Sequence, residues 1–575
     1  MRRAVARVVA LCAIASAPLA IGLWALASAL PMTGQEAQQA AKKEDATKFR
    51  IAGRVVDKLS GSALPGTRVT IAQIASRSQP ASVVTGDEGR FAFDNLEQGK
   101  YSLSAQRRGY PPQGFDAHDQ YATAIVTGRD QDTEHLVFKL VPESVITGRV
   151  MDEMNEPVRN ATVLLIRDGV MEGSDTTRVE RQQQTDDQGA YRFSRVGSGK
   201  HYVAVAAQPW YAQHGFQGMR TMNAGTGTVS LPVPPQVDPA LDVAYPLTYY
   251  PEATETSAAT PIVLQPGSRF NADVTLHPVR ALRMTVRGEA SPGRFLNANL
   301  MERALEGYHV PAHSVGGGQR EPGVVEISGI APGHYQLSVR SFDPQNPRGG
   351  QTSWEREVDV TSDMEVDAGN PPPMVNVSGV LKYEDEEAER GARAQVVVQL
   401  RNVKSRYGAV AQMQPSGEFT FNPGLPPGTY NVLLAAPNVY VKSINASGAK
   451  VLGSRVEIGG SDTAQLTITA SQGVGRVDGI ALREDKGWAG AMVVLVPLGK
   501  SGEDARSLYR RDQSDSDGTF TLPNILPGKY AVLALANGWD IEWGNPAVLK
   551  PYLESAPTVE VAARGKYTVK VNVQP

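Results

Sequence analysis

Residues 85–93 read TGDEGRFAF, and Leu96, Gly99 and Tyr101 follow them closely. A turn rich in aspartate and glycine supplies the positive φ angles and side-chain-to-backbone bonds that reverse the chain. The aromatic residues Phe91 and Phe93 are two positions apart, so they point to the same face of a strand. The stretch therefore predicts a β-hairpin with one apolar face, and such a hairpin needs a second sheet to cover it.

The same pattern occurs five times, which is the sign of a repeat protein. The later copies read TDDQGAYRF (185–193), GVVEI (323–327), SGEFTF (416–421) and SDGTFTL (516–522). A second glycine follows the first by 10 residues in four copies and by 11 in the fourth. Two residues after this second glycine stands a tyrosine, except in the second copy, where His201 replaces it.

Two strands are expected upstream of most copies. Copies one, two, four and five are preceded by an apolar-Gly-x-Val/Ile strand, at 51–55, 146–150, 377–380 and 477–480. A valine-rich strand follows it, at 68–71, 161–165, 394–398 and 491–495, and closing strands are expected at 135–140 and 567–571. About seven short strands per ~100 residues is the strand count of a β-sandwich.

This order of strands and turns resembles the carboxypeptidase regulatory-like domain, well in copies one, two, four and five and weakly in copy three. The resemblance implies a transthyretin-like (prealbumin-like) sandwich. The predicted fold class is all-β, a tandem array of about five Greek-key β-sandwich domains after an N-terminal signal or membrane helix. The expected domains are 49–143, 144–279 with an insertion, a divergent domain 280–372, 373–472 and 473–575.

The N-terminus has the pattern of an export segment. Arg2, Arg3 and Arg7 precede an uncharged run over residues 8–30, as in a signal peptide or a signal-anchor helix. Residues 31–48 read as a polar linker. Cleavage and retention both stay open: the body is expected in the periplasm or outside the cell, or anchored to the cytoplasmic membrane by residues 8–30.

Composition excludes several classes of function. The net charge is −3 and the one cysteine is Cys12, so we expect neither nucleic-acid binding nor a disulfide framework. No zinc motif, nucleophile elbow, P-loop or dinucleotide fingerprint is present. In metallocarboxypeptidases the regulatory-like domain accompanies a catalytic domain, and none is recognisable here, so the chain is expected to be no enzyme and to need no cofactor.

Two groups of residues are candidates for binding. Four aromatic residues of sandwich-end loops are suited to stacking on sugar rings: Trp210, Tyr211, Trp539 and Trp543. The alternative for these rings is packing against neighbouring loops or domains. Three aspartates, Asp512, Asp515 and Asp517, are weak candidates for calcium, and the alternative is that they form Asx turns that cap the hairpin.

The predicted function is an exported, non-catalytic binding or structural protein whose sandwich-end loops contact a polysaccharide or an envelope protein. One alternative is an accessory subunit of a cell-envelope hydrolase. The other is a component of an outer-membrane uptake system.

Overall fold

The computed structural model describes residues 48–575 except for gaps at 75, 77–78, 129, 172, 215–217, 225–226, 234–236, 289–294, 306–307, 313–318, 322, 343–351, 369–373, 385–395, 404–407, 423, 437–438 and 500–502. Phe49–Pro575 forms one compact unit. The predicted export segment and nearly all of the polar linker lie outside the described residues. In the part that is described, no helix combines the length and the apolar character that crossing a bilayer requires.

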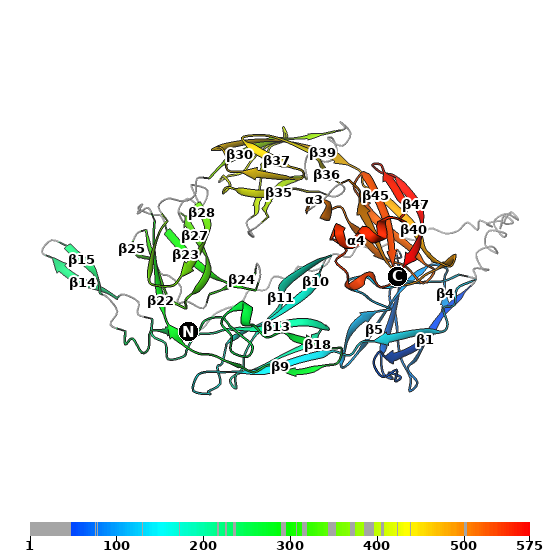
Figure 1. Ribbon diagram of the computed structural model, residues 1–575, viewed down its shortest axis with the longest axis horizontal. Coiled ribbons are helices and arrows are strands. Elements are labelled where there is room, and N and C mark those ends of the chain that lie inside the picture. The colour runs from blue at the N-terminus through cyan, green and yellow to red at the C-terminus, as the bar shows by residue number, and fades with distance from the viewer. Residues whose placement is uncertain are drawn as a thin grey trace, which may run out of the picture. The chain divides into compact units, whose positions relative to one another are not determined.

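The predicted fold class is confirmed: Phe49–Pro575 is a tandem array of β-sandwiches (Figure 1). The strands form two main sheets in each of the segments 49–140, 144–275, 282–367 and 376–472, and one eight-stranded sheet in 475–574. Each segment encloses a hydrophobic cluster of its own. We call these segments the first to the fifth sandwich.

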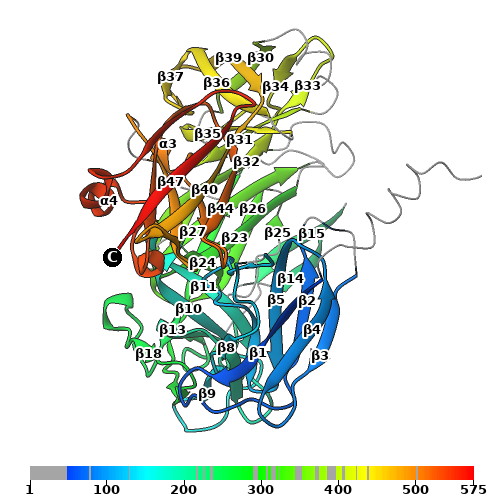
Figure 2. The same ribbon diagram turned by 90° about the vertical axis from the view of Figure 1, so that its right-hand side faces the viewer.

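The first sandwich has two layers, which Figure 2 shows beside each other. One sheet contains β1 (Phe49–Asp57), β4 (Arg90–Leu96) and β8 (Leu136–Leu140). The other contains β2 (Arg68–Gln73), β3 (Ala81–Val84), β5 (Lys100–Arg107), β6 (Tyr110–Gly114) and β7 (Ile125–Val126). Phe91 and Phe93 are both buried in the space between the layers, as the two-residue alternation predicts.

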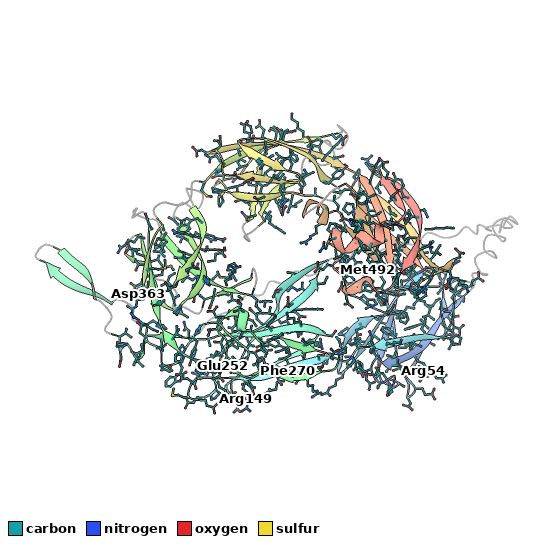
Figure 3. All side chains as sticks on the ribbon, viewed as in Figure 1. Arg54, Arg149, Glu252, Phe270, Asp363 and Met492 are labelled. Atoms are coloured by element: carbon teal, nitrogen blue, oxygen red, sulfur yellow. The ribbon has the colours of Figure 1, made fainter. Side chains whose placement is uncertain are left out.

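The second sandwich repeats this plan with additional strands. Its first sheet has β9 (Ser144–Met151), β12 (Ala190–Val196), β19 (Arg269–Asn271) and β20 (Val274–Thr275). The second sheet has β10 (Thr162–Met171), β11 (Ser174–Gln184), β13 (Gly199–Ala206), β17 (Thr248–Tyr249) and β18 (Ile262–Leu264). Between β13 and β17 the chain adds β14 (Gly218–Ala224), β15 (Gly227–Val233) and β16 (Val243–Ala244), and β16 pairs with β21 (Val279–Arg280). The short helix η1 (Thr256–Ala258) lies between β17 and β18. Phe270 packs on the core from the strand β19 (Figure 3).

The third and fourth sandwiches are four-stranded and five-stranded in each layer. The third pairs β22 (Leu282–Arg287), β25 (Gln319–Glu321), β26 (Val324–Ile330) and β29 (Met364–Asp367) in one sheet, and β23 (Phe295–Ala304), β24 (Tyr308–Pro311), β27 (Gly333–Phe342) and β28 (Thr352–Val360) in the other. The fourth pairs β30 (Asn376–Tyr383), β33 (Gln412–Met413), β34 (Glu418–Thr420), β36 (Val439–Ser447) and β39 (Thr463–Gln472), facing β31 (Val397–Asn402), β32 (Gly408–Val410), β35 (Gly428–Ala435), β37 (Ala449–Leu452) and β38 (Arg455–Ile458).

The fifth sandwich carries helical segments on one side. Its strands are β40 (Gly475–Arg483), β41 (Lys486–Gly487), β42 (Met492–Pro497), β43 (Arg510–Gln513), β44 (Thr519–Ile525), β45 (Gly528–Leu535), β46 (Thr558–Val561) and β47 (Lys566–Gln574). The helices α3 (Glu503–Arg506), η2 (Gly538–Asp540) and α4 (Pro546–Leu553) lie in its connections. A second hydrophobic cluster, which includes Met492, Trp543 and Leu549, forms between these segments and the strands β42 and β45.

All five sandwiches share one pairing rule. The first strand pairs antiparallel with the strand after the Asp/Gly turn and parallel with the last strand of the sandwich. This parallel contact explains the glycine of the first strand. A Cβ added at Gly53, Gly148 or Gly379 would lie 2.1–2.2 Å from a carbonyl oxygen in or directly beside the parallel partner strand.

An aromatic residue lies opposite each of these glycines. The register places Gly53 opposite Phe91, Gly148 opposite Tyr191, Gly379 opposite Phe419 and Gly479 opposite Phe520. A ring that covers a glycine on the neighbouring strand fills the space that the missing side chain leaves. The third sandwich has Val286 opposite Val325 instead, both fully buried. Its weak sequence signal therefore reflects the joint replacement of both partners.

The repeated tyrosine closes the second turn. Its hydroxyl donates to the carbonyl oxygen four residues earlier, in Tyr101, Tyr335, Tyr430 and Tyr530, at 2.7–2.9 Å. This bond resembles the tyrosine corner of other sandwiches. In the second sandwich the fully buried His201 occupies the same position, and its Nδ1 lies 3.1 Å from the carbonyl oxygen of Gly199.

Candidate functional site: the acidic turn of the fifth sandwich

The turn that contains the predicted aspartates is held by a buried hydroxyl. Ser514 accepts from the amide of Ala491 at 2.9 Å and donates to the carbonyl of Trp488 at 2.7 Å. Thr85 and Thr185 make the same pair of bonds in the first and second sandwiches. The turn is thus positioned by local bonds that three copies share.

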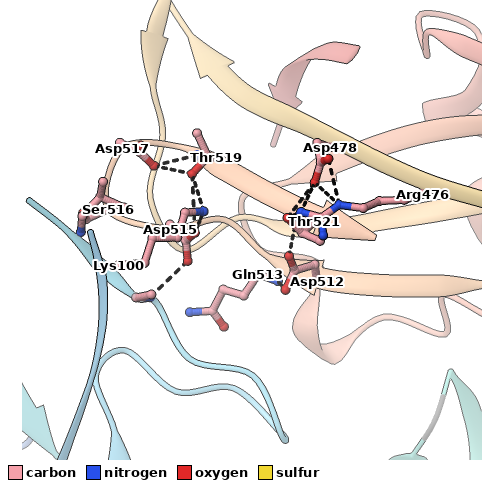
Figure 4. Close-up of polar contacts among 12 residues, drawn as sticks. Lys100, Arg476, Asp478, Asp512, Gln513, Asp515, Ser516, Asp517, Thr519 and Thr521 are labelled. Carbon is pink, nitrogen blue, oxygen red and sulfur yellow. Dashed lines mark hydrogen bonds and ion pairs between the residues drawn. The ribbon is translucent and has the colours of Figure 1, made fainter. Parts of the chain in front are cut away.

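The carboxylates of the turn differ from those of the equivalent turns. In the second sandwich Asp186 accepts from the amides of Gln188 and Ala190, at 3.0 and 2.8 Å, which is an ordinary capped turn. In the fifth sandwich Asp517 takes over this role and accepts from the amide and the hydroxyl of Thr519. The side chain of Asp515 is left to point outward from the turn (Figure 4).

Asp515 reaches the first sandwich. One carboxylate oxygen accepts from the Lys100 ammonium, and the other accepts from the amide of Ala124 at 3.3 Å. Lys100 also donates to the hydroxyl of Thr519 at 2.9 Å (Figure 4). Burial raises the pKa of Asp515, and the neighbouring ammonium opposes this rise.

Two further bonds join the turn to the edge strand β7. The amide of Ser516 donates to the carbonyl of Ala124 at 2.9 Å, and the Ser516 hydroxyl accepts from the amide of Val126 at 2.8 Å. Gln513, which is 2% exposed, donates to the Asp116 carbonyl at 2.6 Å and to the Thr123 hydroxyl at 2.7 Å. The turn therefore satisfies backbone groups of the first sandwich as an additional strand would.

Asp512 lies beside this contact and faces its own sandwich. It accepts from the amide of Thr521 at 2.7 Å, and burial raises its pKa to about 6. Asp478 shows the opposite behaviour, because its hydrogen bond with the Arg476 guanidinium lowers its pKa. Among the residues described, no three His, Cys, Asp or Glu side chains are grouped as metal ligands would be.

Trp539 and Trp543, two of the predicted glycan-stacking residues, lie at the same contact. Trp539 stacks on His118 with ring centroids 4.8 Å apart and planes 6° apart. Trp543 is 9% exposed, and the Arg511 guanidinium lies 4.3 Å from its ring centroid. Arg511 continues to Asp119, at 3.3 Å. Both indole rings therefore contact side chains of this chain.

Trp210 and Tyr211 lie elsewhere, after the last residue of β13. Trp210 is 78% exposed, and its ring meets that of Tyr211 edge-on at 5.7 Å. The Tyr211 hydroxyl donates to Glu153, whose second oxygen accepts from the Tyr245 hydroxyl at 2.9 Å. The four predicted aromatic residues thus form two separate pairs, and the pair at Trp210 is the one with an indole open to solvent.

Several residues of the contact were not anticipated from the sequence, among them Lys100, Gln513, His118 and Arg511. Residues of these types are common in strands and loops, so nothing in the local sequence marks them. Lys100 and Asp515 are also 415 positions apart in the chain. The one local signal is the change at the turn, where the fifth copy has a second aspartate two residues after the first.

The fold and these contacts define a class: a multi-sandwich β protein in which charged and aromatic side chains join the first sandwich to the fifth. Residues 50–140 match the carboxypeptidase regulatory-like domain family. The predicted resemblance is thereby confirmed for the first sandwich.

Proteins of curated function give no match to the chain. Similar solved structures include the TIE protein of Bacillus anthracis, with 11% identity, a TM-score of 0.16 and coverage of 94% of this chain and 77% of that one. The minor pilin of Streptococcus agalactiae has 11% identity and a TM-score of 0.20, over 40% and 96% of the two chains. The major pilin subunit of Bacillus cereus has 9% identity and a TM-score of 0.14, over 74% and 99%. Such low scores transfer no function.

Proposed function

We propose that the protein is a non-catalytic scaffold that acts outside the cytoplasm and binds a polysaccharide of the cell envelope. The observation that carries the binding role is the exposed indole of Trp210 on a loop that hydrogen bonds brace. Tyr211, whose ring Trp210 contacts, donates to Glu153, and so does Tyr245. An exposed ring held in place loses little side-chain entropy when the CH face of a sugar stacks on it.

The non-catalytic role is supported by how the charged residues are used. Lys100 and Asp515 neutralise each other, and Arg511 lies between Asp119 and Trp543. These charged groups join the first sandwich to the fifth, which is the role that a scaffold requires of them.

Retention on insoluble glycans tests the binding role. Soluble protein comprising residues 45–575 is passed over a panel that includes peptidoglycan, cellulose and starch. We expect retention on at least one member of the panel, and Trp210→Ala should reduce it about tenfold, as the loss of a stacking contact does. Trp488→Ala is the matched control, since Trp488 is 37% exposed and lies on the fifth sandwich. Equal loss in both variants, or no retention of the unchanged protein, would contradict the proposal.

Export is tested separately. Protease that is added to intact spheroplasts should digest residues 49–575, while a cytoplasmic marker protein survives. Protection of the body under these conditions would count against a location outside the cytoplasm.

A further inference from the structure

A groove of about 620 Å³ between the first and second sandwiches is lined by arginine. Five of the residues that line it are arginines, Arg68, Arg107, Arg108, Arg192 and Arg195. One carboxylate, that of Glu143, lines it as well. The chain as a whole carries a net charge of −3, so this concentration of positive charge is local and does not follow from composition.

Hydrogen bonds at and near the groove hold the first sandwich to the start of the second. The Gln113 side chain accepts from the amide of Val141 at 3.0 Å and donates to its carbonyl at 2.8 Å. The amide of Glu143 donates to the carbonyl of Gly109 at 3.0 Å. These bonds tie the strand β6 to the segment that leads into β9, so the arginines of the two sandwiches face a common space in a defined arrangement.

Most of the positive charge is not neutralised. Within the described part of the chain, Arg107, Arg108 and Arg192 form no ion pair with a carboxylate. Arg195 has a distant one, with its Nε 4.0 Å from Glu143. Like charges that are gathered without counter-charges raise the local potential and favour an anionic ligand.

The backbone at Arg195 gives an independent indication. Arg195 has a φ of 57°, and the equivalent residues of the first and fifth sandwiches, Asn95 and Asn524, have φ values of 61° and 55°. Asparagine tolerates this left-handed conformation, whereas for most other residues it costs about 1 kcal/mol. Arg181 donates to the carbonyls of Ser194 and Arg195 and so stabilises the turn. Strain at a charged groove residue points to a function of that residue.

We propose that this arginine groove binds an acidic polysaccharide through the carboxylates of its uronic acid residues. The planar guanidinium group binds a carboxylate with two parallel hydrogen bonds. The volume suits a few sugar rings.

A single-stranded nucleic acid would need rings on which its bases stack, whereas the groove's tyrosine, Tyr110, is half-buried and donates its hydroxyl to Asp57 at 2.7 Å. The site is separate from Trp210, so either proposal can fail without the other.

Calorimetry with defined oligomers tests the proposal. The unchanged protein is titrated with hexagalacturonate, with the neutral cellohexaose and with an oligothymidylate of six nucleotides. We expect binding of hexagalacturonate that weakens as salt increases. In Trp210→Ala, which lacks the exposed indole, we expect hexagalacturonate to bind as before and cellohexaose not to bind measurably. Absence of hexagalacturonate binding, or binding of the oligothymidylate at equal affinity, would overturn the proposal.

Variants locate the site. Arg195→Asn introduces the residue that two other copies carry, so it should fold and melt at least as well as the unchanged protein. We expect it to weaken hexagalacturonate binding about tenfold, the effect of losing one charge-assisted hydrogen-bonded contact. Arg108→Gln should act in the same direction. Arg54→Gln, at an exposed arginine outside the groove, and Trp210→Ala should leave the affinity unchanged. An equal loss in Arg54→Gln would show unspecific charge attraction and contradict the site.

Discussion

The glycine of the first strand and the aromatic residue opposite it act as one packing unit. At Gly479 an added Cβ would lie 2.3 Å from the Phe520 ring and 2.6 Å from the carbonyl oxygen of Val569. The ring would have to turn away, and the parallel strand would have to move. The repeated glycine therefore indicates where the backbones of neighbouring strands approach closely, because no larger residue fits between two strands and a ring.

Gly479→Ala should destabilise the fifth sandwich by about 1–3 kcal/mol, the usual range for overpacking in a filled core. Gly460→Ala is the control, since a Cβ at Gly460 meets nothing within 4 Å. Thermal unfolding followed by circular dichroism measures the difference. Equal melting profiles of the two variants would show that the strands adjust without strain.

Asp512 is expected to make stability depend on pH. Its pKa is raised from 3.8 to about 6 in the folded protein because burial disfavours the carboxylate. The folded state then binds the proton more tightly than the unfolded state, so this stabilisation is complete below about pH 4 and is lost as the pH rises through 6. Asp512→Asn should remove this dependence and slow hydrogen exchange of β43 and β44 at pH 7, relative to the unchanged protein.

Asp478→Asn is expected to change the stability at pH 7 in the opposite direction to Asp512→Asn. The hydrogen bond with Arg476 lowers the pKa of Asp478 in the folded protein. The Asp478 carboxylate therefore stabilises the fold at pH values above its pKa in the unfolded chain, and this stabilisation is lost as the pH falls through its pKa in the folded protein. This variant should exchange faster at pH 7. If both variants change the exchange of these strands in the same direction, the environment assigned to Asp512 is wrong.

At the scale of elements, the turn before β44 joins the edge strand β7 through backbone bonds and one ion pair. An edge strand offers unpaired amides and carbonyls, and Ser516 and Asp515 satisfy those of Ala124 and Val126. Lys100 adds charge neutralisation to this pairing. The side chains of the ion pair are 38% and 13% exposed, so screening by solvent reduces its strength.

A double-mutant cycle with Lys100→Met and Asp515→Asn measures that strength. We expect a coupling of about 1 kcal/mol. Lys100→Met alone should cost more than the double variant, because it leaves the carboxylate of Asp515 without its cation. Hydrogen exchange of residues 124–126 and 514–516 is the measurement. Additive single effects would mean that the backbone bonds hold the contact without help from the ion pair.

At the scale of the whole molecule, the sandwiches differ in whether their hydrophobic clusters include residues of a neighbouring sandwich. A hydrophobic cluster with Leu247 and Tyr249 of the second sandwich also contains Ala304 and Val310 of the third. The core of the fourth sandwich contains residues between 375 and 470 alone. Adjacent repeats are therefore expected to depend on each other to different degrees.

Isolated fragments test this difference. Residues 373–472 should fold alone and melt cooperatively. Residues 144–279 should melt lower than residues 144–372, because separation from the third sandwich exposes Leu247 and Tyr249, and they should bind more of a hydrophobic dye. Equal melting of the two longer fragments would show that the shared cluster adds nothing to stability.

The sequence by itself determined the strands, the turns, their fivefold repetition and the buried aromatic positions. These depend on alternation over two residues and on local turn chemistry, and both are written within about ten neighbouring positions. Only the tertiary structure decided which end residues meet: that Asp515 binds Lys100, that Trp539 stacks on His118, and that arginines of β2 and β5 share a groove with arginines of β12. Such contacts depend on how separate cores pack, and no periodicity records the partner of a charge that lies hundreds of residues away.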